Sequence, residues 1–79
     1  MLEENYIGNC VKEARVKYGK KITQTNLSEK MQTKGVDIDN AMISRIESGD
    51  REMSVKELLA LCEVLNVTPN QILKYPKQY

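Results

Sequence analysis

The chain has 79 residues, 41% of them apolar and 29% charged, with a net charge of +1. This length allows one modest core that buries about 60–65% of the unfolded chain's surface, which argues against a second domain. No apolar run reaches the ~20 residues that cross a bilayer, and the N-terminus lacks the pattern of a signal peptide. We therefore expect a cytoplasmic chain without membrane contact, folded as one domain over residues 1–79, with an ordered core from about 4 to 75 and a short tail.

Two lone cysteines and the lack of histidine restrict the chemistry. Cys10 and Cys62 are far apart in the sequence, each among apolar residues at helical spacing. We interpret them as core residues in a reducing compartment, with a disulfide or ligand pair as the less favoured alternative. Because neither cysteine has an evident base beside it, and no phosphate loop or metal-spaced cysteine pair is present, we predict no enzyme. We likewise expect no catalytic residue, metal, cofactor or small-molecule ligand.

The first helix is predicted over residues 4–18, ending at Gly19 as its C-terminal stop. Its inward side is predicted from helical spacing to carry Ile7, Cys10, Val11, Ala14 and Tyr18.

A second helix is expected to begin at Thr23 or Gln24. Its buried residues would be Leu27 and Met31, and Gly35 would cap it in the left-handed conformation, followed by apolar residue 36.

The third helix is predicted over residues 40–48, between an N-cap at Asp39 and a stop at Gly49. Ile43 and Ile46 would face inward.

Two capping boxes mark the last two helices, Ser54 with Glu57 and Thr68 with Gln71. In the second, Pro69 occupies the first helical position, where its missing N–H is not needed. The fifth helix would dock through residues 72 and 73 and end at Pro76. The fourth helix is predicted to be central because its apolar positions are too many for one stripe: Val55, Leu58, Leu59, Leu61, Cys62 and Leu65.

No strand pattern appears, so the sequence predicts an all-α, compact five-helix domain. Its charge is polarised: residues 12–34 carry seven basic and two acidic side chains, or +5, while residues 47–63 carry two basic and five acidic ones, or −3. A positive end on the first two helices suits a polyanion, although a merely solvated surface remains the alternative.

The second and third helices together form the most informative pattern. In a two-helix unit that binds DNA, the first helix meets the backbone with its N-terminus and the second places its N-terminal residues in the major groove. Gln24 suits the first task. Outward residues near the start of the third helix suit the second task, because Asn reads adenine, Arg reads guanine, and small side chains pack on the thymine methyl group. These residues are Asn40, Ala41, Ser44 and Arg45.

The motifs TQxxL at 23–27, ISRIESG at 43–49 and LxxLxxxLxV at 58–67 resemble the phage Cro/repressor-type (XRE-like) helix-turn-helix family. The resemblance covers roughly residues 7–73. It implies a lambda-repressor-like fold and a sequence-specific transcriptional regulator, a repressor that binds a palindromic operator in double-stranded DNA as a homodimer. Glu47 maps to an acid that pairs with a basic residue of the first helix, here Arg15. The implied DNA-binding set is Gln24, Thr25, Asn40, Ala41, Ser44 and Arg45, with Lys20 and Lys21 of the preceding loop.

The chain departs from the family pattern around this unit. The interval from Leu27 to Gly35 is about three residues longer, so the second helix is predicted to gain almost a turn before its cap. Val36 and Asp37 then precede an anchoring Ile38. Ser28 stands where a small alanine is usual, and Lys20 and Lys21 lengthen the previous loop. Asp37 and Asp39 oppose DNA unless they cap the third helix and point away.

Two further hypotheses follow. The alternative function is a protein-interaction module on the same fold, such as an antitoxin or an accessory subunit, favoured by the modest net charge and the long turn. A dimer contact is predicted at the junction of the fourth and fifth helices, unless these residues only close the monomer core. It would use Leu65, Val67, Pro69, Ile72 and Tyr75.

Overall fold

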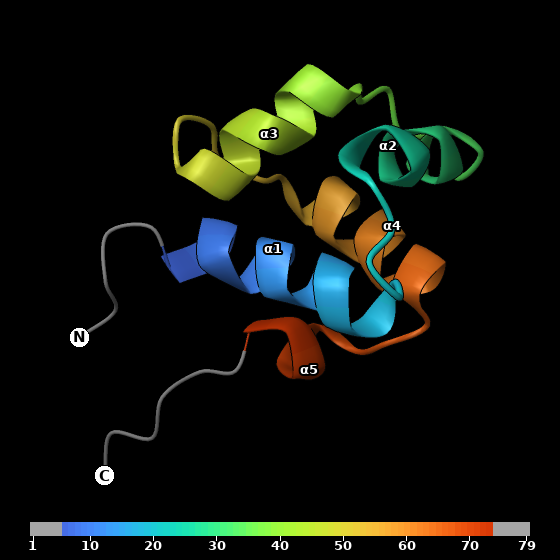
Figure 1. The fold of residues 1–79 in the computed structure, drawn as a ribbon. Helices are drawn as coiled ribbons and strands as arrows, with labels where there is room; N and C mark the ends of the chain where they lie inside the picture. The colour runs from blue at the N-terminus through green and yellow to red at the C-terminus, as the bar shows by residue number, and fades with distance from the viewer. Residues whose placement is uncertain (1–5, 74–79) are drawn as a thin grey trace, which may run out of the picture.

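The computed structural model describes residues 6–73, and within this range every regular element is an α-helix (Figure 1). The elements are α1 Tyr6–Tyr18, α2 Gln24–Gln32, α3 Asn40–Ser48, α4 Val55–Leu65 and α5 Pro69–Leu73. The all-α, five-helix prediction is therefore confirmed. The predicted start of the first helix at residue 4 and the end of the fifth at residue 76 lie outside the described residues.

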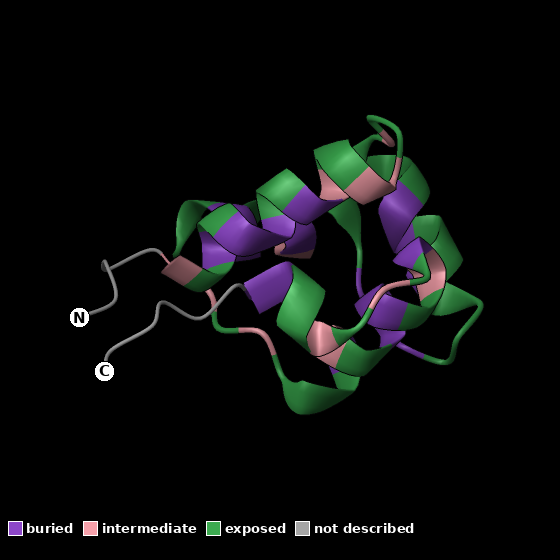
Figure 2. Ribbon diagram, turned by 90° about the horizontal axis from the view of Figure 1, so that it is seen from below, coloured by how far each residue is buried: buried purple, intermediate pink, exposed green. Residues whose placement is uncertain are grey.

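Helix α1 is the hub of the domain. It contacts α3, α4 and α5, while α2 packs between α3 and α4 (Figure 1). Burial follows the same plan, because each helix turns a buried stripe inward and an exposed stripe outward (Figure 2). The most deeply buried large side chains come from five different segments of the chain: Leu27, Ile38, Ile43, Leu61 and Ile72. Both cysteines are buried thiols within this core.

Side-chain caps begin four of the helices, and the caps at Asp39, Ser54 and Thr68 are as predicted. The Thr23 hydroxyl accepts the Asn26 amide at 3.0 Å, and the Asp39 carboxylate accepts the Met42 amide at 2.8 Å. In the last two helices, both halves of each capping box form. Ser54 and Glu57 satisfy each other's backbone amides at α4, and Thr68 and Gln71 do so at α5.

Helix α1 ends at Tyr18 as predicted, but Gly19 is not the residue that turns the chain. Gly19 does not have a positive φ, and the left-handed residues are Lys20 and Lys21, with φ 55 and 63. The Lys21 amide then donates to the Val16 carbonyl at 3.0 Å. Gly19 is required for another reason, since a Cβ there would lie 2.5 Å from Ile22 Cγ2 and 2.6 Å from the Arg15 carbonyl oxygen. The glycine is therefore needed because the loop packs closely on α1, and not because the turn requires a left-handed residue there.

The end of α2 is shorter than predicted. Regular helix stops at Gln32, and residues 33–35 form a tight turn because the Lys34 and Gly35 amides bond three residues back, to Met31 and Gln32. Gly35 is left-handed with φ 85, as predicted, and the Val36 amide closes the motif on the Met31 carbonyl. The extra residues are therefore used in the turn and not in an additional helical turn.

The fourth helix contacts three other helices but is less buried than its apolar count predicted. Val55 is 73% exposed and Leu59 52% exposed, because α4 packs on α1, α2 and α5 with one side and leaves the other uncovered. Ile7, predicted to face the core, is 37% exposed, while the opposite side of the first turn buries Gly8.

The apolar residues predicted to form a dimer contact mostly serve the monomer. Leu65 and Ile72 are buried in the core, and residues 67 and 69 are half-buried. Helix α5 is also fastened to α1, since the Tyr6 hydroxyl and the Cys10 thiol both donate to the Leu73 carbonyl. Tyr75 lies outside the described residues. The surplus of apolar surface that motivated this contact is therefore absent from the described part of α5.

Within residues 6–73, no helix combines the length and apolar character needed to cross a membrane.

Candidate nucleic-acid interface

Helices α2 and α3 form one packed unit despite the long turn between them. Val36 and Ile38 are buried and anchor the turn to the core. The Gln32 side chain adds a polar tie, because its Nε2 donates to the Ile38 carbonyl at 2.7 Å. These apolar and polar contacts hold the turn against the core, and they thereby fix where α3 begins.

The outer face of α3 consists of Asn40, Ala41, Ser44 and Arg45, all exposed. The opposite side of the helix is buried through Ile43 and Ile46, and Gly49 ends the helix at φ 90. The backbone of α3 is therefore fixed on one side and presents a continuous polar stripe on the other. This arrangement brings together the four side chains that sequence reasoning assigned to base edges.

The N-terminus of α2 lies beside this face and carries the remaining predicted contacts. Thr25 is exposed and Gln24 is half-buried. The first N–H groups of a helix have no partner within the helix, so this terminus offers donors to an anion. The Gln24 side chain does not point freely into solvent, because its Nε2 donates to Glu47 Oε1 at 3.0 Å.

Glu47 joins three segments through one carboxylate. Arg15 on α1 donates to it twice, at 2.8 Å from Nε and 3.0 Å from a terminal nitrogen. The Glu47 side chain is only 5% exposed and that of Arg15 14%. Arg15 also donates to the Ile22 carbonyl at 2.8 Å, which ties the α1–α2 loop to the same group. The predicted Arg15–Glu47 pair is thus confirmed, and it fixes α3 and the start of α2 against α1.

The departures from the family pattern near this surface are accommodated locally. The Ser28 hydroxyl is buried where α2 meets the core, and it donates to the Thr25 carbonyl at 2.7 Å. Asp39 is the N-cap of α3 and its carboxylate accepts the Met42 amide. Its negative charge lies at the start of the helix, where the backbone dipole stabilises it.

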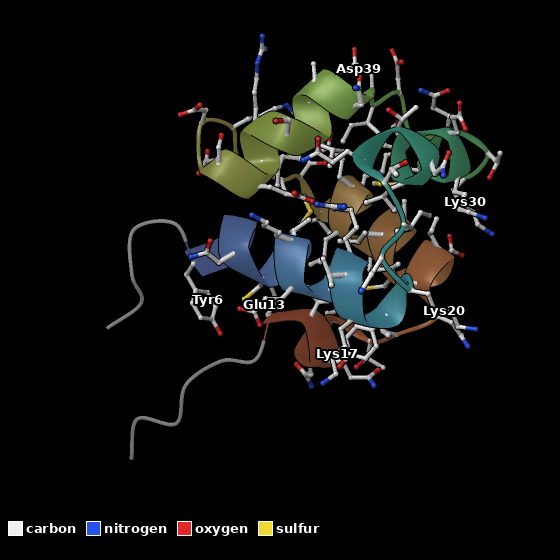
Figure 3. The ribbon with its side chains drawn as sticks, viewed as in Figure 1. Tyr6, Glu13, Lys17, Lys20, Lys30 and Asp39 are labelled. Carbon is white, nitrogen blue, oxygen red and sulfur yellow. The ribbon has the colours of Figure 1, made fainter. Side chains whose placement is uncertain are left out.

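The lysines of the α1–α2 loop adopt unusual backbone conformations. Lys20 and Lys21 are consecutive left-handed residues, with φ 55 and 63, and both side chains are exposed. In Figure 3, Lys20 lies near the end of α1 on the side of α5, whereas Asp39 marks the start of α3 at the top of the molecule. Lys17 likewise points toward the α5 side. The described positive charge therefore spreads around α1 and α2 and does not gather at the outer face of α3.

A second ion pair fixes the segment that follows α3. Arg51 donates twice to Glu57, at 2.9 and 2.7 Å, while Glu57 also accepts the Ser54 amide. These contacts, chiefly the Arg51 hydrogen bond, hold the pKa of the buried Glu57 carboxyl below its ordinary value. The loop from α3 to α4 is consequently locked while Glu57 is ionised.

Cys62 is one of two buried thiols in the described residues. Burial raises the pKa of the Cys62 thiol, which keeps it protonated and poorly nucleophilic at neutral pH. Among residues 6–73, no cluster of three or more carboxylate, thiol or imidazole groups could hold a metal ion.

Sequence reasoning missed two polar contacts of this site. One is the Gln32 tie to Ile38, for which the only sequence signal is a glutamine at the end of a helix before a long turn. The other is the bond from Gln24 to Glu47, which joins residues 23 positions apart. Neither pairing has a local pattern, because both depend on how α2 and α3 are packed.

A family model described as helix-turn-helix matches residues 11–72, which spans α2, α3, α4 and most of α1 and α5. Searches of curated proteins and of solved structures gave no match.

Proposed function

Because the chain belongs to the XRE-like helix-turn-helix family of DNA-binding transcription regulators, we propose that it is a repressor that binds a palindromic operator as a homodimer. In this proposal, α3 enters the major groove. The N-terminus of α2 meets the phosphate backbone beside it. Since such a regulator acts on DNA, the proposal includes a cytoplasmic location.

The observation that carries the proposal is the outer face of α3. Its four exposed polar or small side chains stand on a helix whose inner side is buried and whose two ends are capped. Asn40 suits adenine and Arg45 suits guanine, each through two hydrogen bonds, while Ala41 and Ser44 are small enough to approach a thymine methyl group. The fixed backbone limits the entropy lost when these side chains bind.

The start of α2 is proposed to position the domain on the backbone. A glutamine amide has two N–H donors, and the bond to Glu47 uses one. The other donor of Gln24, with the Thr25 hydroxyl and the first backbone amides of α2, suits a phosphate oxygen. Glu47 would then act as a positioning residue that holds Gln24 toward DNA. Lys21, and less directly Lys20, would contribute through their charge.

A dimer is proposed because one α3 reaches only a few base pairs. Two copies on half-sites about one helical turn, ~34 Å, apart would give a useful affinity and explain a palindromic operator. Repression would follow if the operator overlaps a promoter.

Selection from a random duplex library tests the proposal. The wild-type chain should enrich one inverted-repeat sequence, and its affinity should fall steeply as salt concentration rises, because phosphate contacts release counterions. Arg45→Ala should lose the enrichment, while the control Glu29→Ala, which changes an exposed residue on α2, should keep it. Failure of the wild type to bind any duplex at low salt would contradict the proposal and favour a protein partner for the outer face of α3.

A further inference from the structure

The exposed side of α4 carries apolar side chains that the proposed function leaves unused. Among large apolar side chains of residues 6–73, Val55 and Leu59 have the two highest exposed fractions, 73% and 52%. They are four positions apart and so stand side by side on one face of the helix. Adjacent exposed apolar residues on a capped, well-anchored helix form a small fixed patch that a partner could cover.

We propose that this side of α4 is the contact between two copies of the chain on DNA. The α4 face consists of Val55, Lys56, Leu59 and Glu63. The proposal rests on the proposed function, and it names the interface of the dimer that the proposed function requires.

Charge complementarity favours a second copy as the occupant. Lys56 precedes Leu59 by three residues and Glu63 follows it by four, and both are exposed along the same edge of the α4 face. If two α4 helices pair antiparallel with their Leu59 side chains at the two-fold axis, Lys56 of each copy meets Glu63 of the other. The α4 face is therefore self-complementary, as a symmetric dimer requires.

The position of α4 is compatible with simultaneous DNA binding. In Figure 1, α3 lies at the top of the molecule, and α4 lies behind α1. A vertical two-fold axis behind α4 would place the copies back to back with both α3 helices at the top. Both outer faces of α3 could then meet the same side of a duplex. This pairing uses none of the residues that are proposed to contact DNA.

The size of the α4 face predicts a weak contact. Two apolar side chains per copy form much less than the ~800 Å² per partner that a stable complex buries. Operator half-sites would hold two copies at a high effective concentration, where a weak contact suffices. The contact should therefore appear as cooperative binding to an inverted repeat and only faintly in the unbound protein.

Cooperative DNA binding tests the contact. The probes are a duplex with the inverted repeat enriched by the wild type and a duplex with one half-site. Leu59→Glu should weaken binding to the inverted repeat by ~10-fold or more while leaving half-site affinity unchanged, since it places like charges at the two-fold axis. Val16→Glu is the matched control, because Val16 is also an exposed apolar residue but lies on α1. It should change neither affinity.

A charge exchange makes the test specific for the antiparallel arrangement. Lys56→Glu and Glu63→Lys should each reduce cooperativity by ~3–10-fold, and the double variant should restore it. Non-cooperative binding by the wild type, or a double variant no better than the singles, would overturn the proposal. Equal losses in Leu59→Glu and Val16→Glu would also overturn it.

The two proposals fail in different ways. Loss of the α4 contact leaves half-site binding intact, whereas failure of the proposed function leaves no duplex bound. If no duplex is bound, sedimentation equilibrium of the unbound chain at high concentration tests whether the α4 face joins two copies. A dimer that is lost in Leu59→Glu and kept in Val16→Glu supports it, and a monomer overturns it.

Discussion

Arg45 shows how one exposed side chain can affect binding without affecting the fold. It stands on the outer face of α3, directly before the buried Ile46, and its backbone belongs to a helix anchored on the other side. Arg45→Ala should weaken binding to the selected duplex by about 1–3 kcal/mol and relax the preference at one base pair. The free energy of unfolding should change by less than ~0.5 kcal/mol. Titration of matched and singly altered duplexes measures both effects. An equal loss on selected and random DNA would remove the base-reading role.

Lys20 carries a conformational cost that another residue could relieve. Its φ of 55 is a left-handed value that costs a lysine about 1 kcal/mol relative to glycine. Lys20→Gly should therefore raise the free energy of unfolding by ~0.5–1 kcal/mol, while Lys20→Ala should leave it nearly unchanged. Urea denaturation gives both values. Similar destabilisation by both variants would show that the lysine side chain itself stabilises the loop, and destabilisation by glycine alone would contradict the conformational cost assigned to Lys20.

At the scale of the elements, the ties between helices matter more than any single helix. The Arg15–Glu47 pair joins α1 to α3, and the Gln24 amide extends it to α2. Glu47→Ala should cost more than the ~1 kcal/mol of an exposed pair, because it leaves a shielded Arg15 charge without its partner. Glu29→Ala, at an exposed position, is the control. A double-mutant cycle at positions 15 and 47 measures the coupling, and a coupling energy near zero would contradict this account.

The link between α3 and α4 should respond to pH. Arg51 holds the folded-state pKa of Glu57 below the ordinary glutamate value of about 4.3, so ionised Glu57 stabilises the fold. This contribution is complete above that ordinary value and is lost as pH falls through the lower folded-state pKa. Glu57→Gln should thus be about 1–3 kcal/mol less stable than wild type at pH 7, with the gap closing in acid.

Chemical denaturation between pH 7 and pH 3 checks this expectation. Glu52→Gln serves as the control, because Glu52 is an exposed neighbour in the same loop. A gap between wild type and Glu57→Gln that stays constant over the whole range would show that ionisation of Glu57 is not the cause.

For the whole molecule, local signals in the sequence predicted most of the fold. Caps at Asp39, Ser54 and Thr68 act within a few residues, and the structure begins its helices where these caps predict. The predictions that failed concern contacts between residues that are distant in the sequence. The apolar count of α4 could not reveal that one side of the helix lacks a partner, which left Val55 and Leu59 exposed.

In the candidate site too, local patterns were predicted from the sequence and contacts between distant residues were mostly not. Periodicity alone separated the outer face of α3 from its buried side, because Ile43 and Ile46 fix which side faces the core. The resemblance supplied the Arg15–Glu47 pair, which the structure confirms. The bond from Gln24 to Glu47 and the location of Lys20 near α5 depend on packing and loop geometry, for which a single sequence holds no local signal.

The central claim is that the outer face of α3 reads the major groove at two half-sites. Methylation interference on the selected duplex tests it most directly, because dimethyl sulfate modifies guanine N7 in the major groove and adenine N3 in the minor groove. The account predicts that methylated guanines block binding in two clusters about one helical turn, ~10 base pairs, apart, and that Arg45→Ala abolishes one guanine contact in each cluster. Interference confined to minor-groove adenines, or an unchanged guanine pattern in Arg45→Ala, would contradict it.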